Sequence, residues 1–206
     1  MANRARLSSY LAGAIEAVSN SEMMGWREDL KNKLQSPDLL VYDPVAQESK
    51  KVGKSSGQQV EYIKGLKKAG KWDLFYSSMW RIWFGSIDEN KDIIHCLDML
   101  RIRKHVDGNY ERDLEFWGDA EAVIRSDFII VYMPKDIKTV GTIYEIMLAF
   151  LYHVPIYLIL PDATKTDTNS SLLFGVMISN GEVFYNVNDC VKFIKEKHKI
   201  GTIDKE

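Results

Sequence analysis

Residues 125–149 read RSDFIIVYMPKDIKTVGTIYEIMLA, and this stretch indicates the fold class. Residues 128–132 form a short, almost wholly apolar run that stops before Pro134, which is typical of a buried strand in a parallel sheet. After a loop, residues 143–152 have the length and apolar content of a helix packed on that sheet, with Thr142 as its expected N-cap. Glu145 then falls in the first turn, just beyond a strand end, where open α/β sheets bind ligands. The position equally fits a solvent-exposed Glu that only complements the helix dipole.

The length and composition favour one globular domain. With 206 residues, 46% of them hydrophobic, the chain can bury a sizeable core, so we expect a single domain over residues 1–206. A formal net charge of -2 gives no electrostatic reason to expect nucleic acid or a membrane surface as a partner. No apolar run approaches the roughly 20 residues of a spanning helix. The start of the chain is broken by Ser8, Ser9 and Glu16, unlike a signal peptide, so we expect a cytoplasmic protein.

Cysteine and histidine usage gives no sign of a metal site. Cys96 and Cys190 each lie in a predicted helix, and we interpret them as small core residues in a reducing compartment. The four histidines show no ligand spacing with cysteines or acids. We therefore expect no metal and no other cofactor.

Strand-like runs alternate with helix-like segments along the chain. This alternation predicts an α/β three-layer sandwich with a mostly parallel sheet. Polar loops are expected over residues 47–57 and 162–171. The predicted strands are residues 7–11, 39–42, 128–132 and 154–160, with a short one within 175–185, and the predicted helices are residues 22–34, 110–124, 143–152 and 187–198.

A segment rich in aromatic residues separates the second and third predicted strands. Six Trp, Phe and Tyr side chains recur at helical spacing between residues 72 and 84, so we expect a helical insertion at residues 60–105. Aromatic side chains mostly serve burial, which favours a layer that covers a core over a wall for base stacking. A run of lysines at positions 64, 67, 68 and 71 fits a solvated helix face or a phosphate contact.

Four motifs, taken in order, resemble those of a known family. They are Tyr10-Leu-Ala-Gly13 after the first strand, Trp26-Arg27 on the first helix, Asp127 at the start of the central strand, and Gly141-Thr-x-x-Glu145. Together they resemble the nucleoside 2-deoxyribosyltransferase-like proteins, which include deoxynucleoside 5′-monophosphate N-glycosidases and cytidine monophosphate hydrolases. The resemblance covers roughly the first forty residues and residues 113–160, and it implies a flavodoxin-like sheet.

The resemblance implies nucleophilic catalysis by a carboxylate. Glu145 would attack the anomeric carbon, release the base and leave a glycosyl ester that a second base or water resolves. A second acid would hydrogen-bond or protonate the departing base. The family's spacing of eight positions before Asp127 indicates Asp119, whereas the local match of residues 111–114 indicates Asp113, so both are candidates. Tyr10 and Gly13 would border the sugar, and Gly141 would border the substrate beside Glu145.

The residue six positions before Glu145 bears on the substrate. By resemblance, transferases acting on free nucleosides carry Asp there, whereas the monophosphate N-glycosidases carry a Ser that contacts phosphate. This chain has Thr139 beside Lys138, and a hydroxyl and a cation at a helix N-terminus suit a phosphate. Alternatively, Thr139 only ends the loop and Asp136 takes the place of the missing acid. Nucleosides and nucleoside 5′-monophosphates are therefore equal candidates.

Three functions follow from these motifs. The first is a transferase or hydrolase of nucleotide salvage that exchanges or cleaves N-glycosidic bonds, with a nucleoside or nucleotide and a free nucleobase as its small-molecule partners. The second is a nucleotide-binding module without turnover, because fold does not imply function. The third is a glycosidase for a larger nucleotide, such as a dinucleotide cofactor. The resemblance also implies a homo-oligomer in which a neighbour completes the pocket.

Overall fold

The residues that the structure describes fall into two compact units. The structure is a computed structural model and describes residues 7–15, 18–51, 56–103, 118–135, 139–161, 163–164 and 168–201. One unit, here the sheet unit, comprises Met1–Tyr42 and Ser126–Glu206, and the other, here the helical unit, is Asp43–Arg125. The helical unit extends beyond the insertion expected at residues 60–105 on both sides. That the whole chain forms a single domain stays a prediction.

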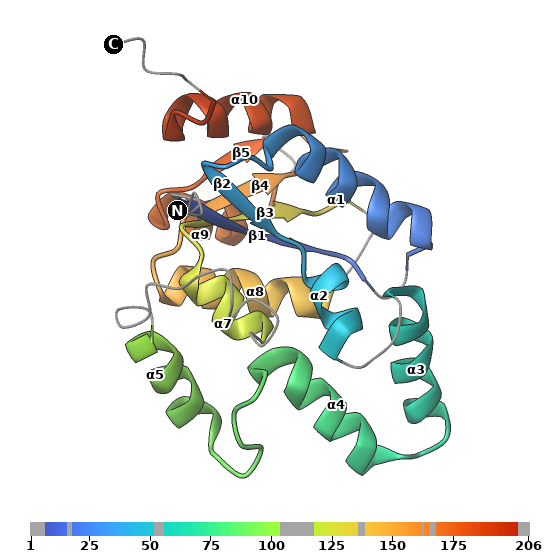
Figure 1. The fold of residues 1–206 in the computed structure, drawn as a ribbon. Coiled ribbons are helices and arrows are strands. Elements are labelled where there is room, and N and C mark those ends of the chain that lie inside the picture. The colour runs from blue at the N-terminus through green and yellow to red at the C-terminus, as the bar shows by residue number, and fades with distance from the viewer. Residues whose placement is uncertain are drawn as a thin grey trace. The chain divides into compact units, whose positions relative to one another are not determined.

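The sheet unit contains a parallel sheet of five described strands in the order β2-β1-β3-β4-β5 (Figure 1). This is the flavodoxin-like order, in which the direction of winding switches between β1 and β3. The α/β three-layer fold predicted from the sequence is thereby confirmed. The strands are β1 (Leu7–Gly13), β2 (Leu39–Tyr42), β3 (Phe128–Tyr132), β4 (Ile156–Ile159) and β5 (Glu182–Phe184).

Helices cover both faces of this sheet (Figure 1). α1 (Asn20–Leu34) and α10 (Val187–His198) pack on one face, and α8 (Val140–Leu151) and α9 (Ser170–Ile178) pack on the other. The first face holds the main hydrophobic core, which includes Leu11 and Phe128 from the sheet and Leu30 and Ile194 from the helices. Because side chains alternate along a strand, Tyr10 of β1 points to the opposite face, where α8 lies.

The start of α1 is set by a capping box. Ser19 Oγ accepts a hydrogen bond from the Glu22 backbone at 3.2 Å, and the Glu22 carboxylate accepts one from the Ser19 backbone at 2.8 Å. This exchange satisfies two of the amide groups that a helix start leaves without partners. The helix begins at Asn20, two residues before the predicted start, and ends at Leu34, ahead of Pro37.

The helical unit builds a core of its own. Ile63, Leu66 and Ile82 are buried together, with Phe75 and Trp83 packed against them. Trp80 is also buried, and its Nε1 donates a hydrogen bond to the Ile87 carbonyl at 2.7 Å. Much of the aromatic content therefore serves packing, although Trp72 and Tyr76 are mostly exposed. The described helices are α2 (Pro44–Lys51), α3 (Ser56–Lys68), α4 (Trp72–Phe84), α5 (Ile93–Arg103) and α7 (Asp119–Arg125).

Helices extend into both segments that the sequence analysis predicted as loops. α2 reaches into residues 47–57 because Pro44 suits the first helical position and Asp43 Oδ1 accepts a hydrogen bond from the Val45 backbone at 3.2 Å. α9 begins inside residues 162–171, where the Asn169 side chain caps the Ser171 and Leu172 amides. Its sequence is apolar on most sides, so no 3.6-residue pattern marked it as a helix. β4 is also shorter than predicted.

Both cysteines are buried free thiols, Cys96 in α5 and Cys190 in α10, and burial raises the pKa of each. This agrees with their interpretation as core residues. In the described part of the chain, no helix combines the length and the apolar character needed to cross a bilayer.

His198 links the stability of the sheet unit to pH. Its ring stacks on Phe128 at 4.7 Å between centroids, and its Nε2 lies 2.9 Å from Tyr157 Oη. Burial, and next the charge of Lys197, lower the pKa of His198, while Asp127 opposes them. As the pH is lowered, His198 therefore binds a proton near pH 6.5 in the unfolded chain, and only at a lower pH in the folded protein. The contribution of neutral His198 to the free energy of unfolding is fully present above about pH 6.5. It is lost as the pH falls from there through the lower pKa of the folded protein.

We expect the free energy of unfolding of the parent protein to decrease between about pH 7 and pH 5. In His198→Gln, which keeps a polar group opposite Tyr157, the decrease should be smaller. Urea unfolding of both proteins at the two pH values measures the difference. Equal decreases in both proteins would show that His198 does not contribute to this pH dependence.

Candidate active site

Tyr10 and Glu145 meet in the interior of the sheet unit, although 135 positions separate them in the sequence. The Tyr10 hydroxyl donates a hydrogen bond of 2.6 Å to Glu145 Oε1. Tyr10 is fully buried and Glu145 is only 6% exposed. The short distance is typical of a hydroxyl that donates to an ionised carboxylate. Two of the residues that the sequence analysis selected are therefore in direct contact.

The helix that carries Glu145 begins earlier than predicted. α8 starts at Val140, with Thr139 as the extended N-cap residue, so Glu145 lies in the second turn and the prediction of a first-turn Glu is wrong. Val140, Gly141 and the predicted N-cap Thr142 all lie inside the helix, although Gly has a helix propensity roughly 1 kcal/mol less favourable than that of Ala. Glu145 lies on the buried side of α8, so the interpretation as a solvent-exposed Glu does not hold.

Two further side chains surround this pair. Tyr42, at the end of β2, stacks on Tyr10 with 5.6 Å between ring centroids and an angle of 18° between the planes. Thr142 lies one helical turn before Glu145 on the buried side of α8 and is 2% exposed. Its Oγ1 has no hydrogen-bond partner among the described residues. The sequence analysis named neither residue in this role, since neither a strand-end Tyr nor a helical Thr is a distinctive signal.

Gly13 ends β1 because no larger residue fits there. A Cβ at this position would lie 2.4 Å from Trp26 Cζ2 and 3.1 Å from the Tyr132 carbonyl oxygen. The Trp26 ring cannot easily move, since it is buried and stacks on Tyr132 at 5.0 Å between centroids. Gly13 therefore allows α1 to approach the ends of β1 and β3.

We expect Gly13→Ala to lower the free energy of unfolding by about 1–3 kcal/mol, the usual cost of an overpacked core. Gly25 in α1 is the matched control, because a Cβ there would meet no described atom within 4 Å. Gly25→Ala should raise stability by up to about 1 kcal/mol through better helix propensity. Urea unfolding measures both variants. A Gly13→Ala variant as stable as the parent would contradict the close contact with Trp26.

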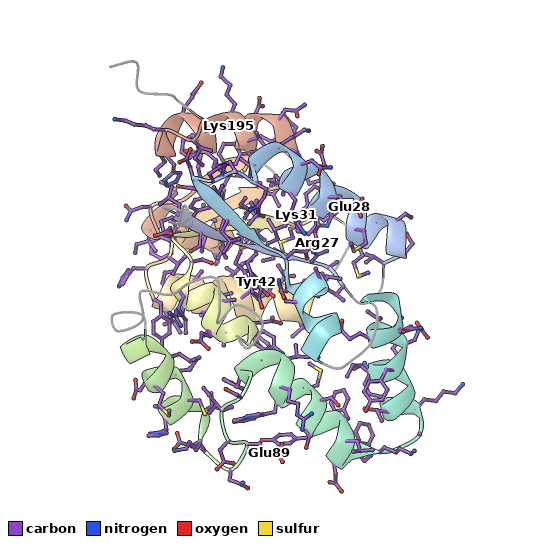
Figure 2. All side chains as sticks on the ribbon, in the orientation of Figure 1. Arg27, Glu28, Lys31, Tyr42, Glu89 and Lys195 are labelled. Carbon is purple, nitrogen blue, oxygen red and sulfur yellow. The ribbon has the colours of Figure 1, made fainter. Side chains whose placement is uncertain are left out.

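Arg27 holds the segment that follows β1. Although charged, it is fully buried in α1 (Figure 2). Its guanidinium donates to the carbonyls of Gly13 at 2.9 Å, Ala14 at 3.2 Å and Met23 at 2.6 Å, and lies 4.3 Å from the Trp26 ring centroid. The sequence feature that could have indicated its burial is its position four residues after Met23, on the side of α1 that faces the sheet. The resemblance named Trp26-Arg27 only as a motif.

Asp127 has a structural role at the amino ends of the strands, opposite the carboxyl ends that lead to the candidate site. Its Oδ2 accepts hydrogen bonds from the Ser8 backbone at 2.7 Å and from Ser8 Oγ at 3.2 Å. These contacts join the amino ends of β1 and β3. The motif residue therefore aligns the two strands whose other ends lead to the candidate site.

Thr139, the N-cap residue of α8, does not cap the helix with its side chain. Thr139 makes no side-chain cap hydrogen bond, and its buried Oγ1 has no partner in the described part of the chain. Gly141 is exposed, and a Cβ there would meet no described atom within 4 Å. Thr139 thus leaves the first amides of α8 without a side-chain cap, and helix N-termini with free amides can accept an anion. Lys138 and Asp136 lie outside the described residues.

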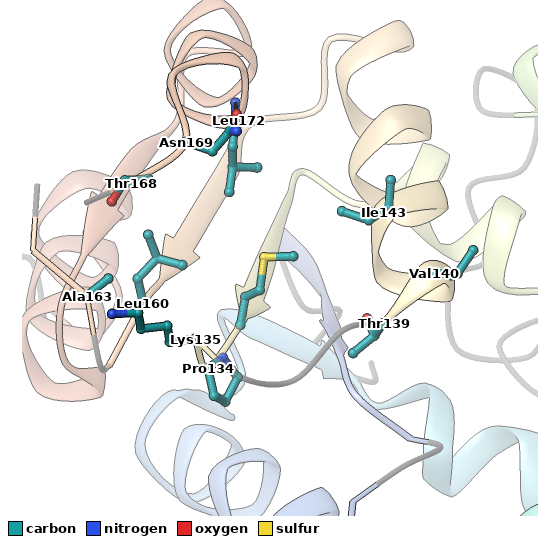
Figure 3. Close-up of a pocket in the computed structure, with 11 residues that line it drawn as sticks. Pro134, Lys135, Thr139, Val140, Ile143, Leu160, Ala163, Thr168, Asn169 and Leu172 are labelled. Atoms are coloured by element: carbon teal, nitrogen blue, oxygen red, sulfur yellow. Dashed lines mark hydrogen bonds between the residues drawn. The ribbon is translucent and has the colours of Figure 1, made fainter. Parts of the chain in front are cut away.

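A pocket of about 370 Å³ lies on the other flank of α8 (Figure 3). Thr139 and Ile143 line one side of it, and Leu160, Asn169 and Leu172 line the other. Ile143 and Glu145 are two positions apart, about 200° around the helix, so they point in nearly opposite directions. Glu145 and Tyr10 do not line this pocket. The Tyr10–Glu145 pair therefore lies outside this largely apolar pocket.

The two candidates for the second acid, Asp119 and Asp113, both belong to the chain segment of the helical unit, whereas Glu145 belongs to the sheet unit. Asp119 is the first residue of α7, in the helical unit, and is 3% exposed. Asp113 lies outside the described residues. The choice between Asp119 and Asp113 therefore stays a prediction.

Among the described residues, no group of three or more His, Cys, Asp and Glu side chains is arranged to hold a metal ion. No protein-family model matches the chain, and no curated protein matches it either. The resemblance to the family named above accordingly depends on the four motifs alone.

Proposed function

We propose that this protein cleaves or exchanges the N-glycosidic bond of a nucleoside, deoxynucleoside or 5′-monophosphate, with Glu145 as the nucleophile. The observation that carries the proposal is the buried hydrogen bond of 2.6 Å between Tyr10 and Glu145 Oε1. A carboxylate nucleophile must be held in one orientation, and a phenol that donates to one oxygen does this while stabilising the negative charge. A surface Glu that only complemented a helix dipole would not need such a partner.

The proposed chemistry has two steps. A Glu145 carboxylate oxygen forms a bond to the anomeric carbon while the bond from that carbon to the base nitrogen breaks, and the electron pair leaves with the base. A second acid, Asp119 or Asp113, supplies the proton that the base needs. Water or another nucleobase then attacks the same carbon and releases the Glu145 carboxylate.

Two hydroxyl groups support a polar ligand near α8. Thr142 Oγ1, on the same buried side as Glu145, and Thr139 Oγ1, at the helix start, both lack a partner among the described residues. Buried hydroxyls normally have a partner, so a ligand hydroxyl or phosphate is a reasonable one. The uncapped N-terminus of α8 supports the inclusion of 5′-monophosphates as substrates.

Base release from a substrate panel tests the proposal. Deoxynucleosides, ribonucleosides and their 5′-monophosphates are incubated with the protein, each with and without a free acceptor base, and the products are separated by chromatography. We expect at least one member to lose its base. Dependence on the acceptor would identify a transferase, and dependence on the phosphate a nucleotide hydrolase. No release from any member by a folded protein would refute the proposal.

A second candidate function is a nucleotide-binding module without turnover. The observation that favours it is the pocket of about 370 Å³, which falls in the size range of ligand sites but is not lined by Glu145. A melting temperature raised by nucleoside monophosphates, without base release, would support this candidate.

A further inference from the structure

The pocket between α8 and α9 has no role in the proposed chemistry. Its volume of about 370 Å³ lies in the lower part of the range of small-molecule sites (Figure 3). Every residue that lines it belongs to the sheet unit, so the pocket forms without any residue of the helical unit. Met133 and Leu160 line it directly after the ends of β3 and β4. The pocket therefore lies at the carboxyl ends of two strands, where open α/β sheets bind ligands.

Apolar side chains form most of the pocket wall. Ile143 of α8 lines one side and Leu172 of α9 the other (Figure 3), with the side chains of Met133 and Leu160 also in the wall. A wall of this kind binds a ligand mainly through the burial of apolar surface. The body of a matching ligand is accordingly a hydrocarbon chain or ring.

The charges around the pocket favour an anion. Among the described residues that line it, Lys135 is the only one with a charged side chain. Lys135 is exposed, and it has no ion-pair partner in the described part of the chain. An unpaired ammonium group at the wall of an apolar pocket can bind a negatively charged group of a ligand.

Two helix N-termini add to this positive charge. Thr139 and Asn169, the N-cap residues of α8 and α9, both line the pocket, from opposite sides (Figure 3). The N-terminus of a helix carries a partial positive charge, which acts over about the first turn. Lys135 and the two helix starts therefore act in the same direction, against a cation and in favour of an anion.

We propose that this pocket binds a small carboxylic acid with a hydrocarbon body. The body packs between Ile143 and Leu172, and the carboxylate lies beside Lys135. A singly charged group matches the single lysine, whereas a ligand without charge would leave that lysine unpaired. Because Tyr10 and Glu145 do not line the pocket, binding there is independent of the proposed chemistry.

Thermal unfolding of the full-length protein tests the class of ligand, with octanoate as the probe. Octanol and octylammonium have the same chain with a neutral and a cationic head group, so they are the matched controls. At about 1 mM, octanoate should raise the melting temperature by about 2–4 °C, octanol by less, and octylammonium not at all. No rise with octanoate would overturn the inference. Equal rises with all three compounds would overturn it as well, and so would a larger rise with a nucleoside monophosphate.

Calorimetric titration with octanoate tests the location of the site. Leu172→Trp and Ile143→Trp each fill the pocket and should weaken binding about tenfold or more. Met177→Trp is the matched control, because Met177 also lies on α9 but does not line the pocket, and it should bind like the parent. Lys135→Met should bind octanoate no better than octanol. Parent-like binding by both pocket-filling variants, or an equal loss in Met177→Trp, would overturn the proposed site.

Discussion

Replacement of Glu145 by Gln is expected to reduce base release about 10³-fold or more while the protein stays folded. Gln has the shape of Glu, and its amide oxygen still accepts the hydrogen bond that Tyr10 donates at 2.6 Å to Oε1. The amide cannot, however, form an ester with the sugar. The rate is measured on the substrate that the parent cleaves best, and circular dichroism verifies the fold.

Tyr10→Phe is the control that separates orientation from chemistry. It removes one hydrogen bond from the carboxylate but leaves the nucleophile, so we expect a smaller loss of about 10- to 100-fold. A 2-fluoro-substituted nucleoside gives a second readout, because the fluorine slows hydrolysis of the glycosyl ester. Mass spectrometry should find the fluorinated sugar attached to the peptide that contains Glu145 in the parent. The same peptide from Glu145→Gln should carry no sugar. A Glu145→Gln variant with activity within tenfold of the parent would exclude Glu145 as the nucleophile.

Replacement of Arg27 by Met is expected to lower the free energy of unfolding by about 2–4 kcal/mol. Met has a similar volume and keeps the packing against Trp26, but it donates no hydrogen bond. The Gly13 and Ala14 carbonyls, which now accept bonds of 2.9 Å and 3.2 Å, would lose this donor. Because Gly13 and Ala14 lie three and four residues after Tyr10, at the end of β1 and just beyond it, we also expect the variant to release base more slowly. Urea unfolding measures the stability.

Lys31→Met is the matched control for Arg27→Met. Lys31 lies one turn later on the same side of α1 but is only half-buried, so the same loss of charge there should change stability by about 1 kcal/mol or less. Arg27→Lys keeps the charge but lacks the forked guanidinium, and we expect its stability to fall between those of Arg27→Met and the parent. Equal stability of Arg27→Met and Lys31→Met would show that the three carbonyl contacts add little.

The elements with clear boundaries were predictable from local sequence. The bounds of β2, β3 and α10 match their predictions, because the two strands are apolar runs stopped by Pro44 and Pro134, and the helix has a regular amphipathic pattern. α9 was missed because its apolar residues do not follow one period. α2 was missed because its polar sequence resembles a loop and only Pro44 marks its start.

The candidate site was predictable residue by residue but not as an arrangement. The motifs selected Tyr10, Gly13, Thr139 and Glu145 separately. Nothing in the sequence indicates that Tyr10 donates to Glu145, since the contact requires β1 and α8 to pack together across 135 positions. The roles of Gly13 and Arg27 likewise depend on how closely α1 approaches the strand ends.

The sequence by itself determined the parallel α/β fold and the chemical groups available to a site, because the period of apolar residues and the residue types are local properties. Only the tertiary structure decided which of these groups meet. It buried Glu145 against Tyr10, assigned Gly13 to packing, and brought the starts of α8 and α9 to one pocket. These outcomes depend on the distances and directions between elements far apart in the chain, which no local pattern of residues specifies.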